Sequence, residues 1–255
     1  WESKLNSCLE KYLRFIILKS KIYRNNNKNG IRTTFILRFV IFIMPLDISQ
    51  YKGPFVLFGN GETPTHTTPI KILKNAVTIL CTDGGADKLK SLGLQPNLIL
   101  GDMDSLSLAH ESYNCEIVEL MDQSKTDLEK SLEWCYENGI GQLSLVGFSG
   151  GQDDHNMAAL WTLVSFFEKM ELTFYSNSSK VKCVKSDTRI DSFTGQTISI
   201  IPTKENIETS ITGLKYSINK SILKPPSFGT RNSAKGDHFS IQSNGPVWVF
   251  LNYVE

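Results

Sequence analysis

The chain has 255 residues, enough for one large domain or two small ones at about 100–200 residues per domain. Hydrophobic residues make up 40% and charged residues 21%, which excludes collagen-like, mucin-like and wholly disordered proteins. The net charge of +1 is unevenly distributed, because residues 1–44 carry nine Lys and Arg against two acids, whereas residues 45–255 carry eighteen against twenty-four. The acidic body argues against broad nucleic-acid binding, which needs clustered Lys and Arg.

The N-terminal 44 residues differ from the remainder of the chain. A basic, Asn-rich stretch from Lys19 to Arg32 precedes an apolar run over residues 35–43 that Arg38 interrupts. This run is too short for a membrane span of about 20 residues, and no signal-peptide cleavage site follows it. We therefore expect residues 1–44 to be a leader or upstream extension outside the fold, with a targeting extension or a membrane-surface helix as alternatives.

Residues 45–178 alternate short apolar runs with helical patterns. Strands are predicted over residues 55–58, 77–81, 97–100, 115–120, 143–146 and 172–175. Helices are predicted between them, over residues 86–92, 127–138 and 157–169. Strands that alternate with helices indicate an α/β domain whose mainly parallel sheet is covered on both faces.

Residues 179–255 show strands without any helical period. The predicted strands cover residues 181–184, 196–201, 210–212, 239–242 and 247–251, and Gly, Pro and Asn turns join them. We expect a separate, smaller all-β domain here. Five cysteines without a CxxC pair fit neither a disulfide framework nor a zinc site, so a reducing compartment, the cytoplasm, is expected.

Acids and glycines gather where the predicted parallel strands end. Asp83-Gly84-Gly85 follows one strand and precedes a helix, whose free N–H groups can bind phosphate, although Asp83 could simply cap that helix. Asp102 and Asp104 follow the next strand, where two carboxylates can bind one Mg²⁺, although an Asx-turn is the simpler alternative. Together with the ends described next, these residues favour a site for Mg²⁺ and a nucleotide.

Two further strand ends carry polar segments. Residues 122–127, Asp-Gln-Ser-Lys-Thr-Asp, include a capping box formed by Thr126 and Glu129, which leaves Asp122, Gln123 and Lys125 unexplained. Residues 147–155 are rich in glycine, including Gly150 and Gly151, and can approach a phosphate closely, although their two aspartates could merely complement the helix dipole.

In these motifs the sequence resembles the thiamine pyrophosphokinase family from about Phe55 to Trp248. The resemblance rests on residues 83–86, 101–105, 122–127 and 147–155, and on Gly213-Leu-Lys-Tyr216 followed by Gly229-Thr-Arg-Asn232. It implies transfer of a diphosphate group from ATP to the hydroxyl of thiamine, which gives thiamine diphosphate and AMP. It also implies an α/β ATP- and Mg²⁺-binding domain, a β-sandwich thiamine-binding domain and a homodimer.

The resemblance also implies roles for individual residues. Asp102, Asp104 and Asp127 match the metal-binding acids, and Asp83 and Asp154 match further acids of the nucleotide and metal site. The thiamine site is expected to include Gln123, Thr230, Arg231, Asn232 and Trp248. Phosphate contacts are expected from Gly84, Gly85, Gly150, Gly151 and Lys125, with Arg231 as a second cation.

The catalytic residues expected are Asp102, Asp104, Asp127 and Asp154, and either Asp127 or Asp154 could accept the proton of the hydroxyl. Arg231 stands where the family usually has a small residue, Asp87 where Asn is common, and Gln152-Asp153 where a basic residue and an apolar one are frequent. Two other functions remain open: a nucleotide-sugar transferase or phosphohydrolase that uses the same DxD metal motif, and a nucleotide-binding module without catalysis.

Overall fold

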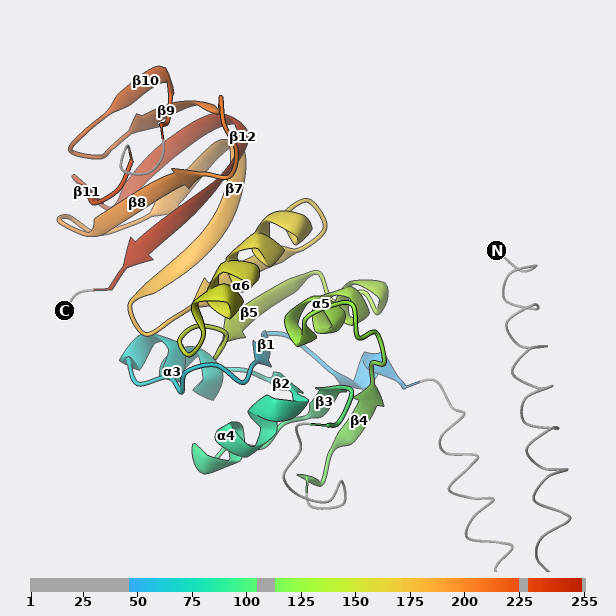
Figure 1. The fold of residues 1–255 in the computed structure, drawn as a ribbon. Coiled ribbons are helices and arrows are strands. Elements are labelled where there is room, and N and C mark those ends of the chain that lie inside the picture. Colours follow the sequence, from blue (N-terminus) through green and yellow to red (C-terminus); the bar gives the residue numbers. More distant parts are fainter. Residues whose placement is uncertain (1–45, 105–112, 225–228, 254–255) are drawn as a thin grey trace, which may run out of the picture. The chain divides into compact units, whose positions relative to one another are not determined.

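The computed structural model describes residues 46–104, 113–224 and 229–253 (Figure 1). The described residues from Ile48 onward form one compact unit. The extension expected over residues 1–44 lies outside the described residues. Among the helices that the structure describes, none is long and apolar enough to cross a membrane.

The first part of the compact unit is a parallel sheet with the spatial order β4-β3-β2-β1-β5-β6. Its strands are β1 (Phe55–Phe58), β2 (Thr78–Thr82), β3 (Leu98–Gly101), β4 (Glu116–Glu119), β5 (Gln142–Val146) and β6 (Glu171–Tyr175). Every one of these strands was predicted to within one residue. These strands are easy to predict from the sequence because a strand buried on both faces is a nearly continuous apolar run.

Helices cover both faces of this sheet. They are α3 (Thr67–Lys74), α4 (Ala86–Ser91), α5 (Asp127–Glu137) and α6 (Asp153–Phe166), with short 3-10 turns η1 (Ile48–Gln50) and η2 (Asp83–Gly85). Leu73 of α3 and Leu89 of α4 pack with Val56 and Phe58 of β1. Side chains alternate along a strand, so β2 and β3 turn their other apolar side chains to α5, which contacts both strands and lies beside α6 (Figure 1).

The helices show two differences from prediction. Helix α3 was not predicted, because its eight residues give little periodic signal; the His66 side chain caps it by accepting a hydrogen bond from Thr68 N at 3.1 Å. Helix α6 begins at Asp153, four residues before the predicted start, and ends at Phe166, three residues before the predicted end, so the polar segment Asp153–Asn156 forms its first turn. Helix α5 and its Thr126 cap, which accepts a hydrogen bond from Glu129 N at 3.3 Å, are confirmed.

The second part of the unit consists of antiparallel strands. They are β7 (Ser179–Asp191), β8 (Thr197–Pro202), β9 (Glu208–Thr212), β10 (Ile218–Ile222), β11 (Asn232–Ser233) and β12 (His238–Asn252). Two strands predicted separately near the C-terminus are one strand, β12, whose register with β7 is irregular between Ser243 and Val247. Asn244-Gly245-Pro246 reads as a turn in the sequence, but β7 pairs with β12 on both sides of it and keeps it in the sheet.

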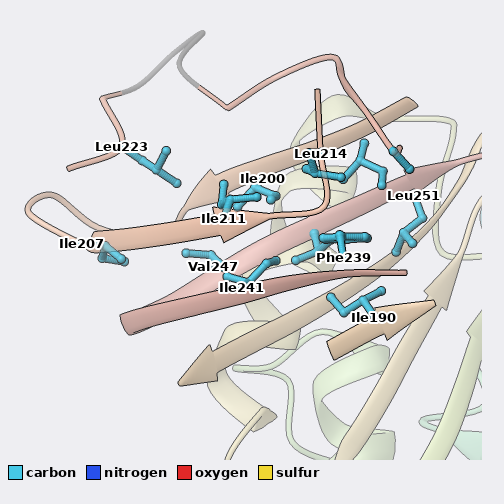
Figure 2. Packing of buried hydrophobic residues seen from close by; sticks show 13 residues of the cluster. Ile190, Ile200, Ile207, Ile211, Leu214, Leu223, Phe239, Ile241, Val247 and Leu251 are labelled. Atoms are coloured by element: carbon cyan, nitrogen blue, oxygen red, sulfur yellow. The ribbon is translucent and has the colours of Figure 1, made fainter. Parts of the chain in front are cut away.

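The antiparallel strands enclose their own apolar core (Figure 2). Strand β12 pairs with β7 along one edge, and along its other edge with β9 through residues 240–243 and with β8 through residues 247–251. The enclosed side chains include Ile200, Ile211, Phe239 and Ile241. All described strands nevertheless belong to one mixed sheet, whose central strands are mostly parallel. The parallel and antiparallel parts join where β6 pairs with β7 in antiparallel orientation. The division into two domains at residue 178 therefore stays a prediction.

Candidate active site

Three carboxylates meet where β2 and β3 end. Asp83 follows β2, and Asp102 and Asp104 follow β3; one oxygen from each lies within 4.8 Å of the others. Adjacent parallel strands end at the same edge of a sheet, so this meeting follows from the topology. A set of carboxylate oxygens is the donor chemistry that Mg²⁺ prefers, and these residues fit such an ion.

Asp83 is fully buried and held by backbone N–H groups. It accepts hydrogen bonds from Gly84 N at 2.8 Å and from Met103 N at 3.0 Å. Burial raises the pKa of Asp83 above its usual value, against the effect of these hydrogen bonds. Met103 has a φ of 68°, a left-handed conformation that turns the chain between Asp102 and Asp104. The backbone of the DxD motif is thus tied to the neighbouring strand end.

Asp102 receives two hydrogen bonds on one oxygen. Its Oδ2 accepts from Gln123 Nε2 at 2.8 Å and from Lys130 Nζ at 3.1 Å. Burial by itself raises the pKa of Asp102, but the hydrogen bonds from Lys130 and Gln123 outweigh it and hold the pKa at about 2. The group is therefore a carboxylate at neutral pH. Gln123, expected in the thiamine site, donates to one of the three clustered acids in this structure.

Lys130, which was not predicted from the sequence, lies between two of the acids. Its side chain is only 4% exposed, and its ammonium lies 2.9 Å from Asp127 Oδ1 as well as 3.1 Å from Asp102 Oδ2. Burial tends to lower the pKa of Lys130, but the hydrogen bonds to both carboxylates raise it above its usual value. The one local signal was the spacing of three residues between Asp127 and Lys130, which brings two side chains together on a helix.

The three clustered acids overlap with the metal set expected from the sequence, which stays a prediction. That expectation placed Asp102, Asp104 and Asp127 on the metal and Asp83 among further acids of the nucleotide and metal site. In the structure Asp83 lies with Asp102 and Asp104, and Asp127 pairs with Lys130. Asp127 nonetheless shares that lysine with Asp102, so it lies at the border of the acidic cluster.

Glycine-rich loops after β1 and β5 interlock beside the acids. Gly61 N donates to Gly147 O and Glu62 N donates to Ser149 O, both at 2.6 Å. Gly150 has a φ of +75°, and a Cβ on it would lie 2.4 Å from the Cβ of Glu62. The Gly59–Glu62 segment was not predicted from the sequence, because its close contact with the loop after β5 is visible only in the tertiary structure.

The loop after β1 is also tied to the segment after β2. Lys88 Nζ donates to Asn60 O at 2.6 Å and to Gly61 O at 2.7 Å. Gly84 leaves room for the Asn60 side chain, because a Cβ there would lie 2.4 Å from Asn60 Nδ2. The loops after β1, β2 and β5 thus lie together, and their backbone N–H groups are of the kind that bind phosphate groups.

Of two other expected site residues, Asp154 is exposed and Lys125 is half-buried. Asp154 is in the first turn of α6 and accepts a hydrogen bond from His155 N at 2.9 Å. Lys125 pairs with Asp122 at 3.3 Å and with Glu133 at 2.6 Å, so its charge is already matched within the chain. Their proposed contacts with substrate stay predictions.

The expected thiamine residues of the β-rich part form structural contacts. Asn232 is buried; its Nδ2 donates to Tyr216 O at 2.7 Å, and its Oδ1 accepts from Tyr216 N at 3.0 Å. Thr230 and Arg231 precede it, and Arg231 has a φ of 52°. Asn232 thereby joins the Gly213–Tyr216 and Gly229–Asn232 motifs, which lie far apart in the sequence.

Trp248 packs on α6. Its Nε1 donates to Leu160 O at 3.0 Å, and its ring meets the half-exposed Trp161 edge-on at a centroid distance of 4.8 Å. The expected contact of Trp248 with thiamine stays a prediction.

The fold and the site define a class: an α/β protein whose acidic cluster and glycine loops lie at the carboxyl edge of a parallel sheet, where phosphorylated ligands bind. Residues 70–174 match the family model described as the catalytic domain of thiamin pyrophosphokinase. The chain is 30% identical over 182 residues to thiamin pyrophosphokinase 1 of Caenorhabditis elegans, covering 65% of this chain and 74% of that protein. This chain belongs to the thiamin pyrophosphokinase family and is an enzyme of that family.

Solved structures show the same fold. The thiamine pyrophosphokinase of Bacillus subtilis superposes with a TM-score of 0.67 at 17% identity, over 79% of this chain and 99% of that one. The thiamin pyrophosphokinase of Candida albicans gives a TM-score of 0.68 at 18% identity, over 78% and 90% of the two chains.

Proposed function

We propose that this protein transfers a diphosphate group from ATP to the hydroxyl of thiamine and releases AMP. Family membership supports the activity, and the observation that carries the site assignment is the meeting of Asp83, Asp102 and Asp104 at adjacent strand ends. The same membership favours this reaction over the DxD-dependent transferase and over the module without catalysis.

We assign Mg²⁺ to the three clustered carboxylates, with Asp127 next to them. When bound, Mg²⁺ would supply electrostatic stabilisation of the phosphate oxygens. The three acids differ in what holds them: backbone N–H groups fix Asp83, whereas side chains from α5 and its preceding loop fix Asp102. Such preorganised ligands do not need to rearrange when the substrates arrive.

The reaction requires a proton acceptor and an aligned nucleophile. The hydroxyl oxygen of thiamine attacks the β-phosphorus, the bond from that phosphorus to the oxygen bridging it to the α-phosphorus breaks, and AMP leaves with the bonding electron pair. The hydroxyl proton passes to a carboxylate, for which Asp127 and Asp154 are the two candidates. Asp154 has no lysine partner among the ion pairs of the described residues, whereas Asp127 pairs with Lys130. A neighbouring positive charge makes a carboxylate a weaker proton acceptor, so this effect favours Asp154.

The glycine loops are proposed to bind the triphosphate and the β-rich part to bind thiamine. Gly84, Gly85, Gly150 and Gly151 would let backbone N–H groups approach phosphate oxygens, with Lys125 and Arg231 as the proposed cations that offset the phosphate charge. Thiamine would contact Gln123, the segment Thr230–Asn232 and the ring of Trp248, where stacking of a cation on indole is worth about 0.5–2 kcal/mol.

A homodimer in the cytoplasm completes the proposal. Asn232 and Trp248 donate hydrogen bonds within their own chain, to Tyr216 O and Leu160 O. A two-fold dimer would let the β-rich part of one chain serve the acidic cluster of the other through a self-complementary interface. The exposed side chains of Met157 and Trp161, one turn apart on α6, offer apolar surface for such an interface.

The deciding experiment incubates the purified full chain with ATP, Mg²⁺ and thiamine. AMP and thiamine diphosphate should form in equal amounts, and ADP as the only product would contradict the proposal. The Asp102→Asn variant should be slower by at least about a hundredfold because a charged group at the reacting phosphates is lost. The matched control is Asp187→Asn, which removes an exposed carboxylate from β7 and should leave the rate unchanged.

A further inference from the structure

A buried lysine stands beside the proposed Mg²⁺ site. The ammonium of Lys130 bridges Asp102 and Asp127, and the lysine is almost fully removed from solvent. A buried charge is tolerated only when hydrogen-bonded partners of opposite charge surround it. Lys130 therefore depends on two of the acids that the family resemblance assigns to the metal.

The lysine also occupies one oxygen of Asp102. Both Lys130 and Gln123 donate to Oδ2 of the Asp102 carboxylate. The bridge thus fixes the orientation of the carboxylate. At the same time it places a positive charge next to the position that a divalent cation would take, and like charges repel strongly where water is excluded.

We propose that Lys130 is a positioning residue that holds Asp102 and Asp127 in place and weakens the site for a bare divalent cation, so that the cation binds together with the phosphates of the nucleotide. This inference rests on the proposed function for the presence of that cation. The anionic phosphates would offset the positive charge of Lys130 when the nucleotide binds. A divalent cation that binds alone would be repelled by this charge, because no anionic phosphate would offset it. The lysine thereby couples occupancy of the metal site to occupancy of the nucleotide site.

The test measures binding of Mn²⁺ to the full chain without nucleotide, by titration calorimetry or by electron paramagnetic resonance of free Mn²⁺. Lys130→Met removes the charge and nearly keeps the volume, and it should tighten Mn²⁺ binding by about tenfold or more. Lys130→Arg keeps the charge and should bind Mn²⁺ within about threefold of the wild type. Turnover of Lys130→Met should fall although its metal site binds more tightly.

Several outcomes would overturn the proposal. Unchanged or weaker Mn²⁺ binding by a folded Lys130→Met chain would show that the lysine does not oppose the cation. Lys130→Gln provides a second neutral residue, and failure of both neutral variants to fold would assign Lys130 to folding instead. Because Mn²⁺ binding is measured without thiamine or ATP, its result is independent of whether thiamine diphosphate is formed.

Discussion

Gly101 and Asp83 are so close that no side chain fits between them: a Cβ on Gly101 would lie 2.6 Å from Asp83 Cγ. Asp83 cannot retreat without losing its hydrogen bonds from Gly84 N and Met103 N. The glycine at the end of β3 is therefore required by the carboxylate at the end of β2.

Replacing Gly101 by alanine should displace Asp83 and impair the proposed metal site. We expect Gly101→Ala to lower kcat/KM by at least about tenfold and to reduce the free energy of unfolding by about 1–3 kcal/mol, the usual cost of overpacking. Steady-state assays and urea unfolding measure the two effects. Gly141→Ala is the matched control, because a Cβ there meets nothing within 4 Å; equal behaviour of the two variants would contradict the argument.

The ion pair of Asp102 predicts how stability depends on pH. Although burial raises the pKa, the hydrogen bonds from Lys130 and Gln123 bring it from the ordinary 3.8 to about 2 in the folded chain. A depressed carboxyl pKa stabilises the folded state above the ordinary value, and this contribution is lost as the pH falls towards about 2. The gap between the thermal midpoints of wild type and Asp102→Asn should hold steady from about pH 7 to pH 5 and narrow below about pH 4. A gap that is the same at pH 3 and pH 7 would argue against this ion pair.

Trp161 of α6 and Trp248 of β12 should stabilise the contact between these two elements through the interaction of their rings. Trp248→Phe removes the hydrogen bond to Leu160 O, at a net cost of about 0.5–1.5 kcal/mol. A double-mutant cycle with Trp161→Ala and Trp248→Ala should give a coupling of about 0.5–1.5 kcal/mol for their edge-on contact. Urea unfolding of the four proteins measures it, and purely additive effects would show that the two rings do not interact.

The proposed dimer predicts that two defective chains can restore each other. An Asp102→Asn chain lacks an acid of the proposed metal site, and a Trp248→Leu chain lacks the proposed stacking ring. If each site takes its acids from one chain and its tryptophan from the other, refolding the two chains together should yield some heterodimers with one intact site. Activity of the mixture should then exceed that of either chain alone. An enzyme that sediments as a monomer while it turns over normally would rule out the shared site.

The sequence alone determined the parallel strands, helix α5 and the acids at the strand ends. These features are local: a doubly buried strand is an apolar run, Thr126 caps the helix that follows it, and a polar residue after a buried strand is visible without knowing its neighbours. The continuity of β12 could not be predicted, because Gly245-Pro246 resembles a turn until the pairing with β7 is known.

The tertiary structure decided which of those acids meet and what holds them. Asp83 joins Asp102 because β2 and β3 are neighbours, and Lys130 reaches Asp102 because α5 packs on those same strands. The glycines of the β1 loop acquire their role only against the β5 loop, and Trp248 finds Leu160 and Trp161 only when α6 lies beside it. Each of these contacts joins residues distant in the sequence, so its stability comes from packing and burial that no local pattern encodes.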